Sequence, residues 1–152
     1  NETMRVLIQR VGYASCKVDG EYTGKIDQGF LMFVGCRESD DDAVIAKMAD
    51  KASGLRIFED ENGKMNRSLE DVGGAILSIS QFTLYADCRK GRRPGFTEAA
   101  RGDTAIKMYD QFNEELRQRG FHVETGIFGA DMKIELLNDG PVTIWLDSDA
   151  IM

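Results

Sequence analysis

The order of hydrophobic and polar positions along the chain predicts many strands. Apolar, β-prone runs flanked by turn residues indicate strands at 5–11, 15–18, 22–26, 29–34, 75–82, 121–125, 132–137 and 142–146. The run 142–146 places apolar side chains at alternate positions, which is typical of a strand with one buried face. Asp19-Gly20 and Asn62-Gly63 are dipeptides that favour tight hairpin turns.

Two longer segments predict helices. The carboxylates of residues 40–42 precede the first, where they can accept from free N–H groups and favour the positive end of the helix dipole. Its apolar positions, and those of the second helix at 104–119, recur at helical spacing, and Gly54 and Gly120 fit the two helix ends. Hairpin-linked strands with two main helices predict an α+β fold: a mainly antiparallel sheet rather than a doubly wound parallel one.

Length and composition bound the class of protein. A chain of 152 residues without repeats or linkers predicts one domain over residues 4–152, and residues 1–3 before Met4 are expected to be an expression remnant. With 42% hydrophobic residues and 30% charged residues, disorder is not expected. No apolar run approaches the roughly 20 residues of a membrane span. The three cysteines are far apart and odd in number, so we expect no disulfide framework and a cytoplasmic protein.

The sequence lacks the residues that several kinds of catalytic or cofactor site require. No pair of cysteines or histidines has the spacing of a zinc site, so no metal is expected. His122 is the only histidine, lies in a predicted strand and is interpreted as a surface residue rather than a catalytic base. Neither a Walker loop nor a GxGxxG motif is present, which argues against nucleotide cofactors.

Three segments carry candidate chemistry, although each also has an ordinary structural interpretation. Residues 80–84 (SQFTL) end a hydrophobic strand with hydroxyl and amide groups, which can bind a carbonyl or attack an ester. Residues 138–143 (NDGPVT) read as a turn before a strand. Residues 88–101, the basic segment, hold five basic residues and one acid in a chain of net charge −7, which indicates an anionic partner such as phosphate.

Together these segments resemble the D-aminoacyl-tRNA deacylase family. SQFTL and NDGPVT look like its two signature motifs, and the similarity extends over nearly the whole chain, including residues 4–20, 63–66 and 126–132. One departure lies in the basic segment, where Arg92 and Gly95 stand in place of the usual Asn and Ser. The resemblance implies a β-barrel-like α+β fold and a homodimer with active sites at its interface. It also implies hydrolysis of the ester that joins a D-amino acid, or mischarged glycine, to the terminal ribose of tRNA.

The resemblance also implies roles for individual residues. The catalytic strand end comprises Ser80, Gln81, Phe82 and Thr83. Gly140 and Pro141, joined by a cis bond, form a steric filter that reads chirality and reaches into the partner subunit's site. Further substrate contacts come from Phe128, Met132, Asn138, Val142 and Thr143, with Phe128 and Met132 at the terminal adenosine. Within the basic segment, Arg89, Lys90, Arg92 and Arg93 are expected to meet tRNA phosphates. The expected partners are tRNA and a second copy of the chain, without DNA, membrane or cofactor.

The sequence is compatible with more than one mechanism of ester hydrolysis. An aminoacyl ester is already activated, so the protein must chiefly hold it and stabilise the oxyanion, for which backbone N–H groups near Phe82 and Thr83 are candidates. Thr83 is either a nucleophile or a positioning group that leaves assistance to the neighbouring ribose hydroxyl; the motif has no base to take its proton, which favours positioning. A tRNA-end binding protein without catalysis and a metal-dependent esterase are the competing classes.

Overall fold

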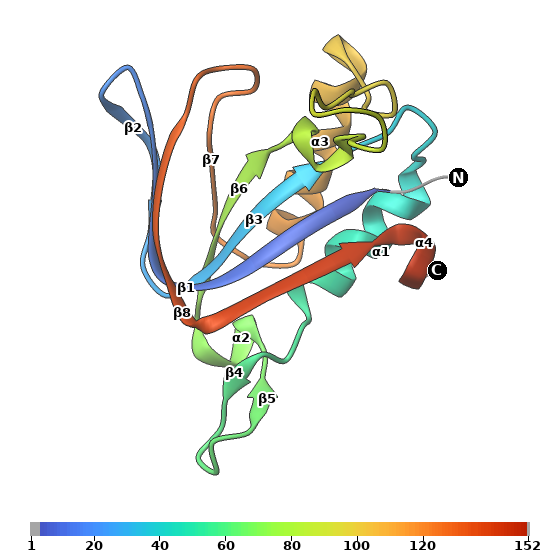
Figure 1. The fold of residues 1–152 in the computed structure, drawn as a ribbon. Coiled ribbons are helices and arrows are strands. Elements are labelled where there is room, and N and C mark those ends of the chain that lie inside the picture. Colours follow the sequence, from blue (N-terminus) through green and yellow to red (C-terminus); the bar gives the residue numbers. More distant parts are fainter. Residues whose placement is uncertain (1–3, 152) are drawn as a thin grey trace.

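A six-stranded, nearly closed sheet forms the centre of the molecule. The computed structural model describes residues 4–151, and the expectation for residues 1–3 lies outside them. Neighbouring strands follow the order β2-β1-β3-β6-β7, and β8 pairs with β1 as well (Figure 1). Their bounds are β1 Arg5–Val18, β2 Glu21–Ile26, β3 Gly29–Gly35, β6 Ala75–Ser80, β7 Val123–Thr125 and β8 Lys133–Asp147. The predicted α+β, barrel-like fold is confirmed.

The two longest strands each join segments that the sequence predicts as separate strands. β1 is continuous because it changes partners along its length, pairing with β3 through Arg5–Val11 and with β2 through Ala14–Val18. β8 follows β1 on its other edge over nearly its whole length, so the predicted strands 132–137 and 142–146 are also one. The break predicted between them is a shift in pairing register near Asn138, where the strand turns sharply (Figure 1).

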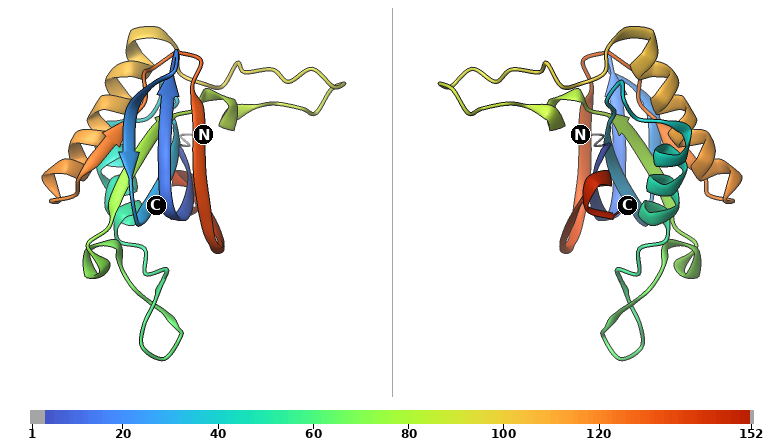
Figure 2. Two further views of the ribbon diagram at one scale, coloured as in Figure 1. Left: turned by 90° about the vertical axis from the view of Figure 1, so that its left-hand side faces the viewer. Right: turned by 90° about the vertical axis from the view of Figure 1, so that its right-hand side faces the viewer.

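The sheet is mixed, with antiparallel pairs around β1 and parallel pairs β3–β6 and β6–β7. Parallel neighbours need a crossover, and the helices α1 (Asp42–Ser53) and α3 (Gly102–Gln118) lie in those connections. Both helices cover one side of the sheet, and their apolar faces pack into a core with β1, β3 and β6 (Figure 2). As the acidic run predicts, α1 begins after an acid: the Asp41 carboxylate accepts from Val44 N–H at 2.9 Å.

A second, smaller core fills the barrel between β1, β2, β3, β6 and β8. Barrel closure depends on the approach of β2 to β7, where the Lys25 backbone N–H donates to Glu124 Oε1 at 3.3 Å. Gly24 permits this approach, because a Cβ at that position would lie 2.9 Å from the carbonyl oxygen of Thr125. The two core clusters therefore share one sheet, with the helices on its outside.

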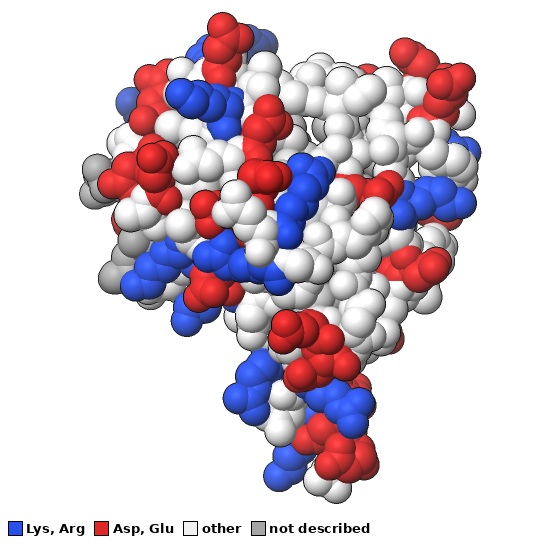
Figure 3. Space-filling view, turned by 180° about the vertical axis from the view of Figure 1, so that it is seen from behind, with Lys and Arg blue, Asp and Glu red and all other residues white. Residues whose placement is uncertain are grey.

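The remaining elements are short. They are β4 (Phe58–Glu59), β5 (Met65–Arg67), α2 (Leu69–Val72), the 3-10 helix η1 (Phe82–Tyr85) and α4 (Ser148–Ile151). The β4–β5 hairpin and the basic segment extend from the body (Figure 2), and charges of both signs cover the hairpin when the molecule is seen from behind (Figure 3). The predicted strand 75–82 ends two residues early, since the chain coils into η1 after Gln81. None of the helices within residues 4–151 is long and apolar enough to span a membrane.

Candidate active site

A pocket of about 250 Å³ opens where β3 and β6 end. The strand end Ser80-Gln81-Phe82 forms one side, and Tyr109 of α3 lies behind it. The opposite side is the β7–β8 connection, through Phe128 and Met132. Five of the residues expected at the site, from two distant segments, therefore share one cavity.

The turn from β6 into η1 shapes the first side of the pocket. The backbone N–H of Gln81 donates to the carbonyl of Val34 at 2.8 Å, which ends the ladder between β3 and β6. Phe82 and Thr83 then begin η1, and the first N–H groups of a helix have no acceptor within that helix. These two amides are therefore available to a ligand oxygen at the pocket's edge.

Thr83 lies beside the pocket rather than in its wall, and it is exposed. Its hydroxyl oxygen accepts a hydrogen bond from the side-chain amide of Gln81. An amide N–H is a donor and takes no proton, so this contact orients the hydroxyl without activating it. Phe82, 55% exposed, packs its ring edge-on against Phe96 of the basic segment, with ring centroids 5.0 Å apart.

Tyr109 is a pocket residue that the sequence does not single out. Its helical spacing identifies it as a core residue, and it is indeed buried, with its hydroxyl donating to the carbonyl of Ser78 at 2.5 Å. Burial raises the pKa of Tyr109, so the hydroxyl keeps its proton and this hydrogen bond. Tyr109 thereby ties α3 to β6 just before the strand end, and its ring faces Phe128 at 6.3 Å.

Cys36 also lines the pocket, at the end of β3. Desolvation, with a smaller contribution from Asp40, raises the pKa of its thiol to about 12. A thiol is a nucleophile only as thiolate, so Cys36 is inert near neutral pH. His122, the remaining candidate for a base, is 68% exposed on the surface, where it pairs with Glu124 at 2.8 Å, and it is absent from the pocket wall.

The NDGPVT motif lies elsewhere. Residues 138–143, which we call the β8 corner, form the sharp turn of β8 at the opposite end of the sheet from the pocket (Figure 1). None of the pocket's lining residues comes from the corner. The Gly140–Pro141 bond is cis, as the resemblance implies. Within one chain, the structure therefore separates Asn138, Gly140, Pro141, Val142 and Thr143 from the strand end and the adenosine side of the pocket.

Hydrogen bonds fix the β8 corner from several sides. Asn138 Oδ1 accepts from Val142 N–H at 3.1 Å, and Asn138 Nδ2 donates to Thr143 Oγ1 at 3.1 Å. Gln9 of β1 also donates to Thr143 Oγ1, at 3.3 Å. Gly140 has φ 135°, a region that favours glycine, and a Cβ there would lie 2.8 Å from Val142 Cγ2. The tip of the corner, Gly140 and Pro141, is exposed and presented outward.

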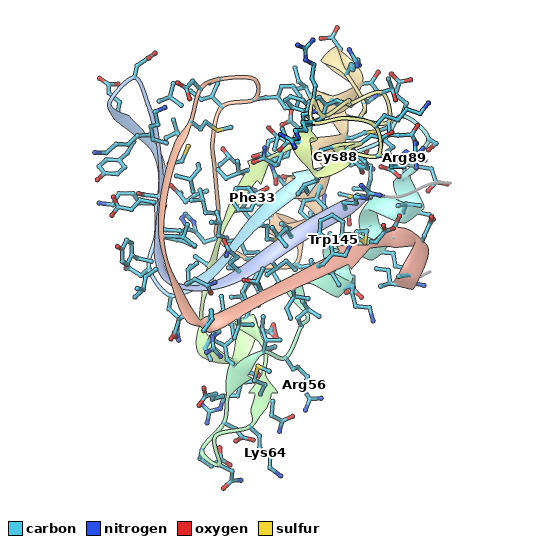
Figure 4. All side chains as sticks on the ribbon, in the orientation of Figure 1. Phe33, Arg56, Lys64, Cys88, Arg89 and Trp145 are labelled. Atoms are coloured by element: carbon cyan, nitrogen blue, oxygen red, sulfur yellow. The ribbon has the colours of Figure 1, made fainter. Side chains whose placement is uncertain are left out.

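The basic segment projects from the same side of the molecule as β8 (Figure 2). Backbone hydrogen bonds between Asp87 and Gly95, at 2.8 and 2.9 Å, close its base. Lys90, Arg92 and Arg93 are exposed in it, whereas Arg89, also exposed, forms a two-pronged pair with Asp87 at 2.8 and 2.9 Å (Figure 4). The hydrogen bonds from Arg89 lower the pKa of Asp87 to about 2. The positive charge of Arg89 is therefore partly neutralised by the Asp87 carboxylate.

The family model and the curated relatives identify one family. The family model described as D-Tyr-tRNA(Tyr) deacylase matches residues 7–147. Curated D-aminoacyl-tRNA deacylases from Thermus aquaticus and Thermomicrobium roseum are 57% and 61% identical to the chain, over 95% of it and 95% and 94% of their own lengths.

Two solved structures are also similar. One, named c-Myc DNA Unwinding Element Binding Protein, is 39% identical with a TM-score of 0.87, over 93% of this chain and 97% of that one. A probable eukaryotic D-amino acid tRNA deacylase is 19% identical with a TM-score of 0.84, over 95% of this chain and 99% of that one, and supports the fold alone.

Proposed function

The chain belongs to the D-Tyr-tRNA(Tyr) deacylase family and is a D-aminoacyl-tRNA hydrolase, and from this premise we propose how its parts divide the reaction. The pocket binds the aminoacylated 3′ end of tRNA, with the terminal adenosine between Phe128 and Met132. The ester carbonyl lies at the strand end, where the N–H groups of Phe82 and Thr83 stabilise the oxyanion. Water breaks the ester, releasing the free amino acid and tRNA.

Thr83 positions the substrate in this proposal and is not the nucleophile. Its hydroxyl accepts a hydrogen bond from the Gln81 side-chain amide, which is a donor and cannot take a proton, and no basic side chain lines the pocket. The ribose hydroxyl beside the ester is a ready source of assistance, held in place by binding of the nucleoside. Ser80 and Gln81 complete the polar edge against which the ester rests.

The observation that carries the remaining proposal is the separation of the two motifs within one chain. A corner at the far end of the sheet can act on the pocket only if it belongs to a second copy. A second copy can cover the part of the outer face of β1 and β8 that runs from the Tyr13–Leu137 pair to Trp145, because these three apolar side chains are exposed there, Trp145 by 48% (Figure 4). We therefore propose a homodimer in which Gly140 and Pro141 of each subunit enter the other's site.

In that arrangement the corner reads handedness. Both enantiomers carry the same groups, so a site rejects the L form only with a rigid obstacle on one side of the α-carbon. A backbone corner held by Asn138, Thr143 and Arg10 cannot rotate away as a side chain can. A thousandfold preference needs only about 4 kcal/mol of differential transition-state energy. Glycine has no side chain to reject, so it is a substrate under the same proposal, and the enzyme proofreads aminoacylation in the cytoplasm.

A direct assay tests the function. Purified protein is incubated with D-tyrosyl-tRNA, L-tyrosyl-tRNA or glycyl-tRNA, and loss of the ester is followed with and without EDTA. We expect hydrolysis of the D-tyrosyl and glycyl esters, sparing of the L-tyrosyl ester, and no effect of EDTA. Equal rates on both enantiomers would overturn the handedness proposal, and loss of activity in EDTA that zinc restores would identify a metal-dependent esterase instead.

A further inference from the structure

Lysines gather around an exposed tyrosine on the outer face of β2, β1 and β8. Lys17 of β1 pairs with Tyr22 of β2 on one side and with Lys133 of β8 on the other, so these three side chains form one row across three strands. The Lys17 and Lys25 ammonium groups lie 4.6 and 4.5 Å from the centroid of the Tyr22 ring. Tyr22 itself is 53% exposed. We call these four residues the lysine–tyrosine patch.

The fold alone does not account for this grouping. Like charges directly opposite each other on neighbouring strands destabilise a sheet, and Lys17 faces Lys133 in this way. Within the described part of the chain, neither Lys17 nor Lys25 takes part in a salt bridge, and Lys133 pairs only with Asp131 in a contact where both side chains are more than 75% exposed. Such exposed pairs are weak and exchange readily for another anion.

The acids near the patch are mostly engaged by other groups. Glu124 accepts the Lys25 backbone N–H and pairs with His122, and Glu135 lies 3.5 Å from the Tyr13 hydroxyl. Glu21 is exposed at the start of β2 beside Tyr22. The ammonium groups of Lys17 and Lys25 are thus held on an aromatic ring but left without a carboxylate, which suits an external anion.

The patch lies next to the pocket. Met132 and Ile134 line the pocket wall, and Lys133 between them points to the opposite face of the same strand. A chain leaving the pocket over the β7–β8 connection therefore reaches the patch directly. The basic segment is a separate projection that extends from the body on the side away from α3 (Figure 2).

We propose that the lysine–tyrosine patch binds the single-stranded nucleotides that precede the terminal adenosine of the substrate. The proposal rests on the function above, because it needs an RNA end in the pocket. Phosphates of this strand replace Asp131 at Lys133 and meet Lys17 and Lys25, while the exposed part of the Tyr22 ring offers a surface for a base. Because Tyr22 already orders both lysines, less side-chain freedom is lost on binding.

Steady-state hydrolysis of D-tyrosyl-tRNA at several salt concentrations tests this. The variant is Lys17→Ala/Lys25→Ala, and the matched control is Lys47→Ala/Lys51→Ala, which removes the same charge from exposed positions on α1. We expect the patch variant to raise KM about tenfold, with a much smaller change in kcat, and to reduce the salt slope of log(kcat/KM) by about 1.4, at roughly 0.7 per lost contact with a single strand. The control should match wild type.

Two further arms make the result specific. Lys17→Arg/Lys25→Arg keeps the charge and should restore KM, and on D-tyrosyl-adenosine, which lacks the preceding phosphates, the defect should shrink to below twofold. A patch variant with wild-type KM and salt slope overturns the inference, as does an equal loss in the control or on D-tyrosyl-adenosine. If wild type itself fails to hydrolyse D-tyrosyl-tRNA, the proposed function fails; in that event, unchanged binding of uncharged tRNA by the patch variant overturns the patch separately.

Discussion

Arg10 donates a hydrogen bond from Nε to the carbonyl oxygen of Asp139, at 2.9 Å, across the bend in β8. A second bond runs from Arg10 Nη1 to the carbonyl of Ile57, at 2.8 Å, just before β4. The residue is only 5% exposed, and Glu59 and Asp139 carboxylates approach its guanidinium to 3.9 and 4.0 Å. One buried cation on β1 thus holds the β8 corner against the base of the β4–β5 hairpin.

Arg10→Met should therefore loosen the corner. The change leaves two carbonyls without their donor, and we expect it to lower the free energy of unfolding by about 2–4 kcal/mol. The ratio of kcat/KM for D-tyrosyl-tRNA to that for L-tyrosyl-tRNA should fall at the same time. Urea unfolding and the deacylation assay measure the two effects. Arg67→Met, at a residue whose side chain is 48% exposed and paired with Glu61, should change neither.

The role of Thr83 follows from comparing two changes. The Thr83 hydroxyl accepts from a hydrogen-bond donor and, among residues 4–151, has no base beside it. Thr83→Ala should therefore lower kcat by about tenfold or less, the size of effect expected when only the positioning of the substrate is lost. Replacing the terminal adenosine of the tRNA by 2′-deoxyadenosine should cost more, because it removes the assisting hydroxyl. Single-turnover rates for the two cases decide between the mechanisms, and an acyl-threonine trapped by acid quenching would show that Thr83 is the nucleophile.

The basic segment should contribute in proportion to its free charges. Arg89→Ala/Lys90→Ala should raise KM and flatten the salt slope by up to about two units if each side chain contacts one phosphate. Because Asp87 already binds Arg89, Asp87→Asn should act in the opposite direction, with a lower KM and a steeper slope. Unchanged salt slopes in both variants would show that the basic segment contacts no phosphate and is either exposed to solvent or part of the dimer contact.

Cysteine reactivity should differ between the pocket and the basic segment. Cys36 is buried with a pKa of about 12, whereas Cys88 is exposed. At pH 8 iodoacetamide should modify Cys88 and spare Cys36, as measured by peptide mass spectrometry. The pKa of Cys36 is raised on folding, so its contribution to stability is complete below pH 9 and is lost as pH rises toward 12. Modification of Cys36 at pH 8 in folded protein would contradict its burial.

The success of sequence interpretation depends on how local each feature is. Helix α1 begins where the acids predict because Asp41 caps it within three residues, and alternation correctly identifies the strand around Ile144. The sequence does not predict the continuity of β1 and β8, because it depends on partner strands that are distant in sequence, and the parallel pairing of β3 with β6 is equally non-local. The helical spacing of Tyr109 predicts a core residue and does not indicate that its ring also lines a pocket.

The same limit applies to the site. Two signature motifs identify the family from sequence, but only the topology reveals that the strand end and the β8 corner lie at opposite ends of the sheet. Sequence motifs state which residues act together and leave open whether they do so within one chain. Because the structure separates the two motifs within one chain, an experiment with mixed dimers can test whether they act together across two chains.

Complementation between a corner variant and a strand-end variant, each first shown to be inactive on D-tyrosyl-tRNA as a homodimer, tests whether the corner acts across the interface. Gly140→Ala distorts the corner, because a Cβ there would lie 2.8 Å from Val142 Cγ2 and 3.1 Å from Arg10 Nη2. Gln81→Ala removes the polar side chain from the strand end. If each site combines the pocket of one subunit with the corner of the other, a mixed dimer holds one intact site and one doubly altered site. Random exchange of equal amounts should then restore about a quarter of wild-type activity, because half of the dimers are mixed and each has one working site of two. Sites formed within single chains would give no recovery of activity. If mass spectrometry verifies that subunits have exchanged and activity is still not recovered, the cross-subunit role of the corner is refuted.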